Sequence, residues 1–221
     1  MRVSIVSSGR RAASGKVARI VVLALLLAAR RSPLAAVTVD RIAATVDQQV
    51  LTVSEINQMV QVRFFPTNDR REILDALIAQ ALRFRDVERF GAQDIPKDTI
   101  ETRLGDIERR FSSPAELTAA LTTAELSLDE LRALIKRQLQ VEAYIQERFA
   151  PMIFVSNEDI ESAYAGTWSQ QRRERGLPIP PLGEVREEIR TLIRSRQLQL
   201  EVDKWTAQLR ARANVDIYAW R

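Results

Sequence analysis

The chain has 221 residues, 46% of them hydrophobic and 28% charged, which is ordinary for a folded globular protein and argues against disorder of the whole. It has no cysteine and no histidine, which excludes disulfides, thiolate chemistry, a Ser-His-Asp triad and histidine zinc sites. Seven of its 33 basic residues and none of its 29 acidic residues lie in residues 1–36, so the rest is slightly acidic and lacks the basic character of a nucleic-acid-binding protein.

The first segment has the pattern of a secretory signal. Several Arg and Lys residues precede the apolar run IVVLALLLAA, residues 20–29, which is too short to span a bilayer. We therefore predict that residues 1–36 are a signal peptide, cleaved near residues 33–36, and that no stable membrane span remains after cleavage. The alternatives are an uncleaved interfacial anchor and a twin-arginine signal based on Arg10-Arg11.

Strand-like alternation is confined to a few short segments. Residues 42–46, IAATV, alternate with a period of two, and a polar turn separates them from a second extended pair at residues 50–51. Two short strands do not form a stable sheet in water. The final VDIYAW, residues 215–220, is the other convincing alternating segment, so we predict that it pairs with residues 42–46 in one small sheet.

The rest of the chain has helical periodicity and helix-capping signals. Capping boxes at Thr52 and Ser127, and Ser156 as a further N-cap, mark three predicted helix starts. Residues 166–183, GTWSQQRRERGLPIPPLG, lack an apolar period and are predicted to be a loop or linker. The predicted fold is mostly α with a small β-sheet, and its helices are expected at residues 53–64, 69–90, 96–111, 114–123, 128–150, 157–164 and 184–213.

No pattern of catalytic or cofactor-binding residues stands out. The seven glycines form no phosphate-binding loop, and the acidic clusters at residues 158–161 and 184–188 lie in first helical turns, where negative charge favours the helix dipole. The arginines of residues 172–175 are typical of a solvated loop. We expect a binding protein without cofactor or metal, although lysine-based or carboxylate-only catalysis remains formally possible.

The order of these segments resembles that of SurA-type periplasmic chaperones. The resemblance covers about residues 39–165 and 184–219, and it rests on the segments VDRIAATVDQQVLTVSEI, ILDALIAQALRFRDVERFG, LDELRALIKRQLQVEAYI, VSNEDIESAY and EVREEIRTLIRSRQLQLEVDKWTAQLRARANVDIY. It implies an N-terminal helical chaperone domain over residues 37–165 and a C-terminal helix and strand, residues 184–221, that complete the core. Fewer than twenty residues separate Ala165 from Glu184, so a linker, residues 166–183, replaces the parvulin domain usual in the family.

The resemblance also implies a function. It points to a periplasmic, ATP-independent holdase that binds unfolded polypeptides, outer-membrane protein precursors among them, and that has no isomerase activity. The alternatives are a non-catalytic envelope adaptor or structural subunit with one dedicated partner, and a residual isomerase. The sequence does not indicate the oligomeric state.

A holdase needs adaptable apolar side chains that clients can reach. Large apolar residues at helix ends or beside links are candidates, with ordinary core packing as the alternative for each. Phe65 is the strongest, because the helical stripe through Phe64 assigns only Phe64 to the core and leaves its neighbour partly exposed or in a cleft. The candidates for peptide binding are Met59, Phe64, Phe65, Phe149, Met152 and Trp168.

Overall fold

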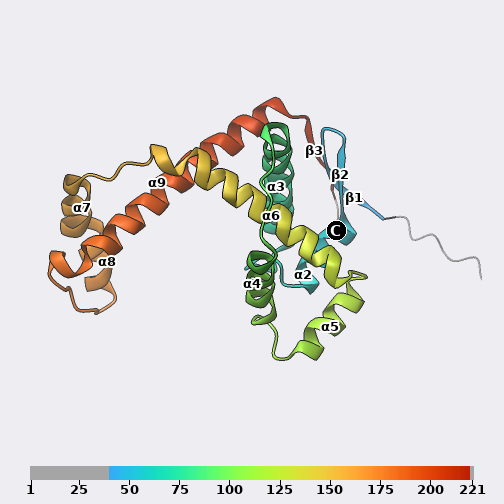
Figure 1. Cartoon of the computed structure of the whole chain (residues 1–221), viewed down its shortest axis with the longest axis horizontal. Helices are drawn as coiled ribbons and strands as arrows, with labels where there is room; N and C mark the ends of the chain where they lie inside the picture. The colour runs from blue at the N-terminus through green and yellow to red at the C-terminus, as the bar shows by residue number, and fades with distance from the viewer. Residues whose placement is uncertain (1–39, 220–221) are drawn as a thin grey trace, which may run out of the picture. The chain divides into compact units, whose positions relative to one another are not determined.

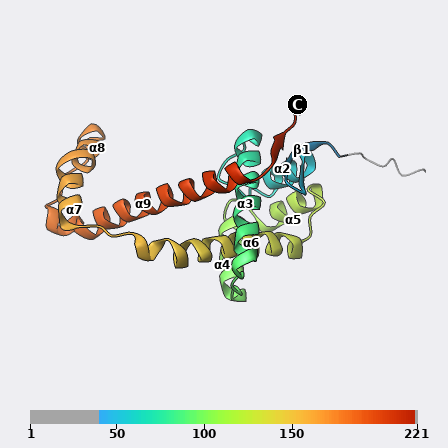
Figure 2. The same cartoon turned by 90° about the horizontal axis from the view of Figure 1, so that it is seen from above.

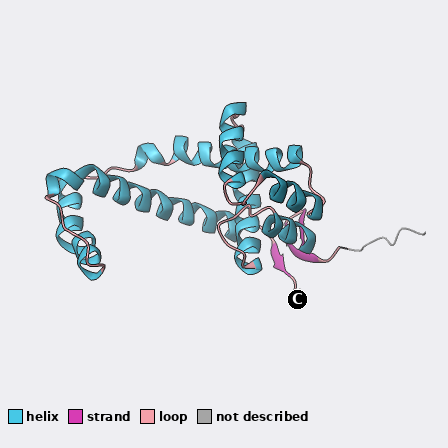
Figure 3. Ribbon diagram, turned by 90° about the horizontal axis from the view of Figure 1, so that it is seen from below, coloured by secondary structure: helices cyan, strands magenta, loops and turns pink. Residues whose placement is uncertain are grey.

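The computed structural model describes residues 40–219 of the chain. The predicted signal peptide and its cleavage site lie outside these residues. Within residues 40–219, no helix combines the length and apolar character that crossing a bilayer requires. Helices make up most of this part of the chain, and its strands form one small sheet (Figure 3), so the predicted mostly α fold is confirmed.

The sheet joins segments from opposite ends of the described chain (Figure 1). Strands β1 (Ile42–Val46), β2 (Gln49–Thr52) and β3 (Val215–Ile217) lie in the order β2-β1-β3, and both pairs are antiparallel. Val46 pairs with Val215, and the Tyr218 N–H donates to the Ala43 carbonyl oxygen at 3.0 Å. The predicted pairing of the first and last strands is therefore confirmed.

The helices largely follow the predicted boundaries. Thr52 and Ser127 form the two expected capping boxes, and Ser156 forms a third with Asp159. Gly91, at φ +98°, ends the second helix as expected. The α-helices are α2 (Val53–Gln61), α3 (Arg70–Phe90), α4 (Lys97–Glu108), α5 (Pro114–Thr123), α6 (Leu128–Arg148), α7 (Asn157–Ala163), α8 (Ser169–Glu174) and α9 (Leu182–Arg212).

Helix α2 ends earlier than its apolar stripe predicted. Arg63 adopts φ +49°, its N–H donates to the Val60 carbonyl, and the Phe64 N–H donates to the Met59 carbonyl at 3.0 Å. This Schellman motif turns the chain back, so that Phe64 and Met59 are both buried in the core. Phe64 is a core residue as predicted, but it lies beyond the helix, and Met59 rather than Val60 is the buried member of the last turn.

The main core surrounds α3. Its fully buried side chains come from the sheet, α2, α3 and α6, and they include Ala44, Ile56, Ile78 and Ile135. Helix α9 packs against α3 near its own C-terminal end (Figure 2), as the sequence predicted. We refer to the sheet, α2–α6 and the C-terminal part of α9 as the body.

A second, smaller core lies in the segment predicted to contain a linker. Residues 164–174 comprise a π-helical turn (Tyr164–Trp168), which is kinked at Gly166 (φ −98°, ψ −107°), and α8, so the prediction of a loop over residues 166–183 was wrong for residues 169–174. Ile160, Trp168, Val185 and Ile189 form its buried cluster, and α7 packs beside the first turns of α9. Val185 and Ile189 belong to the predicted period of the last helix, whereas Trp168 lies in a segment without an apolar period, so the sequence did not reveal the cluster as a whole. We call α7, the π-helical turn, α8 and the first turns of α9 the α7–α8 lobe (Figure 1).

Candidate functional site

The structure buries most of the candidate peptide-binding residues. Met59, Phe149 and Trp168 are each less than a tenth exposed, as is Phe64, so their burial fits the alternative of ordinary core packing, which the sequence already predicted for Phe64; their part in peptide binding stays a prediction. Met59 and Phe64 meet in the Schellman turn, while Phe149 and Trp168 belong to separate clusters. In this conformation these four side chains pack inside the protein and not at its surface. Of the six, only Phe65 and Met152 present substantial area to solvent.

Phe65 lines a pocket between α3 and α6. The pocket has a volume of about 320 Å³. Its walls come from Ala76 and Gln80 on α3 and from Val141 and Ile145 on α6. The Phe65 ring stands edge-on to Phe64, with centroids 5.1 Å apart, which fixes its orientation at the pocket margin. We call this the α3–α6 pocket; its lining combines apolar side chains with the polar Gln80 and Gln138 and the charged Arg83 and Glu142.

Two arginines define the charge of the α3–α6 pocket. Arg83 donates from Nε to Thr206 Oγ1 on α9 at 2.7 Å, and burial lowers its pKa, an effect that Asp203 opposes. Arg103 donates to both carboxylate oxygens of Glu142, at 3.0 and 2.8 Å, and this hydrogen bonding raises the pKa of Arg103. Arg103 therefore pairs with Glu142 of the lining, and Arg83 is a further cation that lines the pocket.

The floor of the α3–α6 pocket continues into an aromatic cluster. Val141 and Ile145 line the pocket and also pack in this cluster. Ring centroids are 5.6 Å apart for Tyr144 and Trp205, 5.4 Å for Phe149 and Trp205, and 6.3 Å for Phe90 and Tyr144. The Trp205 Nε1–H donates to Asp86 at 3.1 Å, so its polar edge is satisfied. The four rings of the cluster are Phe90, Tyr144, Phe149 and Trp205.

Several large apolar side chains beside this cluster are exposed. Phe90 is 61% exposed at the end of α3, and Met152 and Phe154, in the link from α6 to α7, are 64% and 82% exposed. Ala150 in the same link accepts a hydrogen bond from Arg194 of α9 at 3.1 Å, which ties the link to the helix. We call Phe90, Met152 and Phe154 the exposed apolar trio. Exposed large apolar side chains are candidates for an interaction site.

Sequence reasoning missed Phe90 and Phe154. Phe154 stands in an extended link just before the Ser156 N-cap, where no helix face can bury it, and this position was a usable signal. Phe90 is the last residue of α3 before Gly91, a helix end similar to those used to choose the other candidates. Trp205 could not be assigned in the same way, because its partners come from α3 and α6, far away in the sequence.

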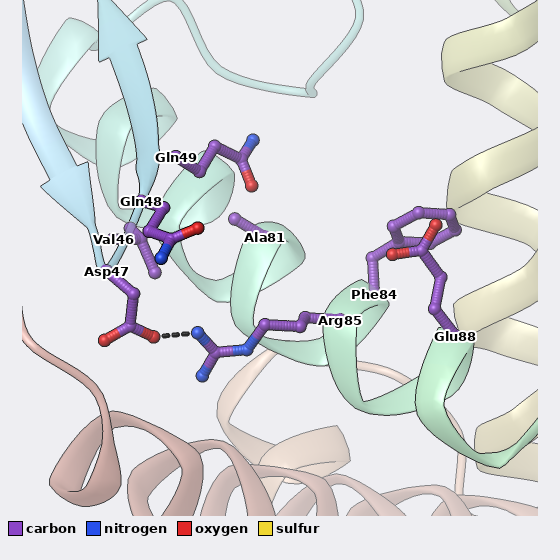
Figure 4. A pocket seen from close by; sticks show the side chains of 8 residues that line it. All are labelled: Val46, Asp47, Gln48, Gln49, Ala81, Phe84, Arg85 and Glu88. Carbon is purple, nitrogen blue, oxygen red and sulfur yellow. Dashed lines mark ion pairs between the residues drawn. The ribbon is translucent and has the colours of Figure 1, made fainter.

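A further pocket, of about 410 Å³, lies where the β1–β2 turn meets α3 (Figure 4). Asp47 forms an ion pair with Arg85, and its Oδ1 also accepts from the Asn214 N–H at 2.8 Å. Asp47 therefore ties the turn both to α3 and to the residue before β3. Within residues 40–219, no group of acidic residues is arranged to hold a metal ion.

Comparison with known proteins places these features in context. No protein-family model matches the chain. Three curated proteins named Chaperone SurA are similar to it: those of Saccharophagus degradans (26% identity over 67% of this chain and 39% of the relative), Pseudomonas putida (28%, 64% and 37%) and Pseudomonas fluorescens (25%, 64% and 36%). The chain spans less than two fifths of the length of these relatives.

The fold and the site define a mostly helical binding protein with a small sheet, an apolar pocket and exposed aromatic side chains. Its similarity to three proteins named Chaperone SurA supports a chaperone role.

Proposed function

We propose that the chain is a periplasmic, ATP-independent holdase that binds unfolded exported proteins, including outer-membrane protein precursors. The observations that carry the proposal are the apolar part of the α3–α6 pocket and the exposed apolar trio, in a chain similar to SurA chaperones. Extended apolar segments of a client would lie against Phe65, Ile145 and the trio.

The chemistry of this surface suits weak, broad binding. Burial of apolar area contributes roughly 25 cal/mol per Å², so a few aromatic and methionine contacts hold a client without a shaped specificity pocket. Met152 is flexible and adapts to different partners. Glu142 in the pocket lining is paired with Arg103, so it does not present an uncompensated negative charge to a client.

In this proposal residues 37–165 form the chaperone domain and residues 184–221 complete its core. Residues 166–183 stand where relatives of the SurA type carry a parvulin insertion, and they include part of the α7–α8 lobe. No isomerase activity is proposed, since the chain has no histidine for a parvulin-like site.

Aggregation assays test the proposal directly. A denatured outer-membrane protein, diluted into buffer without nucleotide, should scatter less light when the purified chain is present. Phe65→Ser should weaken this suppression with little loss of stability, and combined Met152→Ser and Phe154→Ser should weaken it further. Leu128→Ser is the matched control, because Leu128 is an exposed apolar residue at the opposite end of α6.

Three results would redirect the assignment. Failure to suppress aggregation of several unrelated denatured proteins would favour an adaptor with one dedicated partner. Undiminished suppression by the Phe65 and link variants would place the client surface elsewhere on the chain. Strong acceleration of a proline-limited refolding reaction would instead indicate a residual isomerase.

A further inference from the structure

The connection between α8 and α9 has the sequence Leu-Pro-Ile-Pro-Pro, residues 177–181. Each proline fixes its own φ near −65° and lacks an N–H, and each residue before a proline is pushed towards extended backbone. Pro181 has φ −56° and ψ 145°, close to polyproline II geometry. The local chemistry therefore favours a short polyproline II segment, which has no internal hydrogen bonds of its own.

The α7–α8 lobe holds this segment by its backbone. Gly176, at φ +67°, ends α8, and the Leu177 N–H donates to the Arg172 carbonyl at 2.9 Å. Arg172 Nε donates to the Pro178 carbonyl at 2.7 Å, and the Tyr164 hydroxyl donates to the Pro180 carbonyl at 2.9 Å. Two backbone carbonyls of the segment, two residues apart, are thus held by side chains of the lobe.

The tethers themselves are anchored in the lobe core. The Arg172 guanidinium stacks over Trp168, 4.8 Å from the ring centroid, and the Tyr164 ring stacks on Trp168 with centroids 5.6 Å apart. Trp168 is buried and donates from Nε1 to Glu188 of α9 at 3.2 Å. One buried tryptophan therefore supports both side chains that fix the proline-rich segment.

The side chains of the segment face the solvent instead. Leu177 is 45% and Ile179 is 38% exposed, and Pro178 and Pro181 are exposed as well. Polyproline II repeats every three residues, so in that conformation Pro178 and Pro181 would lie on the same edge. A connection that served only to join α8 to α9 would turn its apolar side chains inward. Here the backbone faces the lobe, and the apolar side chains are presented outward.

We propose that residues 177–181 are a preformed ligand for a partner protein whose aromatic-lined groove recognises polyproline II, with an acidic rim that receives Arg173 and Arg175. Both arginines are exposed immediately before the segment. Aromatic grooves accept such segments because the ligand loses little conformational entropy on binding. The tethers to Arg172 and Tyr164 lower that cost further by fixing the backbone beforehand.

The test measures binding of the full chain to a probe, an isolated SH3 domain with an acidic rim. Binding is detected as a change in the fluorescence of the tryptophan in the groove of the SH3 domain. A free peptide of residues 173–183 serves as the reference ligand. The chain should bind at least as tightly as the peptide. Pro178→Ala with Pro181→Ala should weaken binding at least tenfold, and Arg175→Glu should weaken it several-fold and reduce its dependence on salt.

Pro66→Ala is the matched control, because Pro66 is an exposed proline in another connection, and it should leave binding unchanged. Leu177→Ser with Ile179→Ser keeps all prolines and provides a second loss-of-binding variant in case the alanine variant perturbs the lobe.

The proposal is overturned if neither chain nor peptide binds, if the peptide binds and the folded chain does not, or if the variants bind like the wild type. Suppression of client aggregation should be unchanged in all these variants, so failure here is separable from failure of the holdase proposal.

Discussion

The body and the α7–α8 lobe are built on different principles. The body core joins Ala44 from β1, Ile78 from α3 and Ile135 from α6, and its sheet closes only when β3 pairs with β1. The buried cluster of the lobe comes entirely from residues 160–189 and consists of four side chains. Long-range contacts thus hold the body together, whereas local contacts around one tryptophan hold the lobe.

This difference bears on how each region responds to damage. A core assembled from distant segments unfolds as a unit, because the loss of one contact weakens all the others. A small cluster with few buried side chains opens locally at lower free energy. The two proposed surfaces should therefore differ in stability, because the α3–α6 pocket belongs to the body and the proline-rich segment belongs to the lobe.

The sharpest test of the body is Phe64→Ala. Phe64 is buried behind the Schellman turn that ends α2, so truncation should lower the free energy of unfolding by about 3 kcal/mol. Phe65→Ala is the neighbouring control and should cost much less, because its side chain is partly exposed at the pocket margin. Urea denaturation measures both. Equal losses would mean that the two rings share the same burial.

Removal of residues 215–221 tests the long-range closure of the body. The truncated chain loses the β1–β3 pairing and the Tyr218 to Ala43 hydrogen bond, and each net hydrogen bond is worth about 1 kcal/mol. We expect a loss of roughly 2 kcal/mol in the free energy of unfolding and a lower melting temperature. An unchanged melting temperature would show that β3 is dispensable for the body.

Ile160→Ala tests whether the lobe opens on its own. Ile160 is fully buried in the lobe, so the substitution should leave a cavity there and accelerate amide hydrogen exchange in α7 and the π-helical turn. The midpoint of global urea unfolding should change little. Equal acceleration of exchange in α3 would show that body and lobe unfold together.

The smallest expected effect is a pH response at the start of α7. The Ser156 hydroxyl and N–H hydrogen-bond to the Asp159 carboxylate at 2.7 and 2.9 Å and lower the pKa of Asp159 below 3.8. A lowered pKa means that the stabilisation is complete above the ordinary pKa and is lost as pH falls through the folded value. Below about pH 4, the amides of the first turn of α7 should exchange faster.

Two comparisons control this response. Ser156→Ala should remove most of the pH dependence, because the hydroxyl no longer stabilises the charged carboxylate. In α6, the Ser127 N–H and hydroxyl lower the pKa of Glu130 in the same way, but α6 has 21 residues against 7 in α7. The start of α6 should therefore remain protected over the same pH range. Parallel loss of protection at both helix starts would contradict the contrast between body and lobe.

Local rules predicted much of the body but little of the lobe or the site. Capping boxes at Thr52 and Ser127 depend on residues three apart, so the sequence alone identified these helix starts. Arg63 takes a left-handed conformation that its residue type does not suggest, so the end of α2 was misplaced. The burial of Trp168 depends on α9, and that of Phe149 on Trp205, contacts that no local period reveals.

The pairing of β1 with β3 also sets an order of events during synthesis. A chain is made from its N-terminus, so β1 and β2 exist long before Val215 is added, and until then β1 has one edge without its native partner. Contacts between such distant segments slow folding, because ordering the intervening chain costs conformational entropy before these contacts can form and offset that cost. In the nascent protein, β1 would therefore keep an open strand edge until β3 had been made.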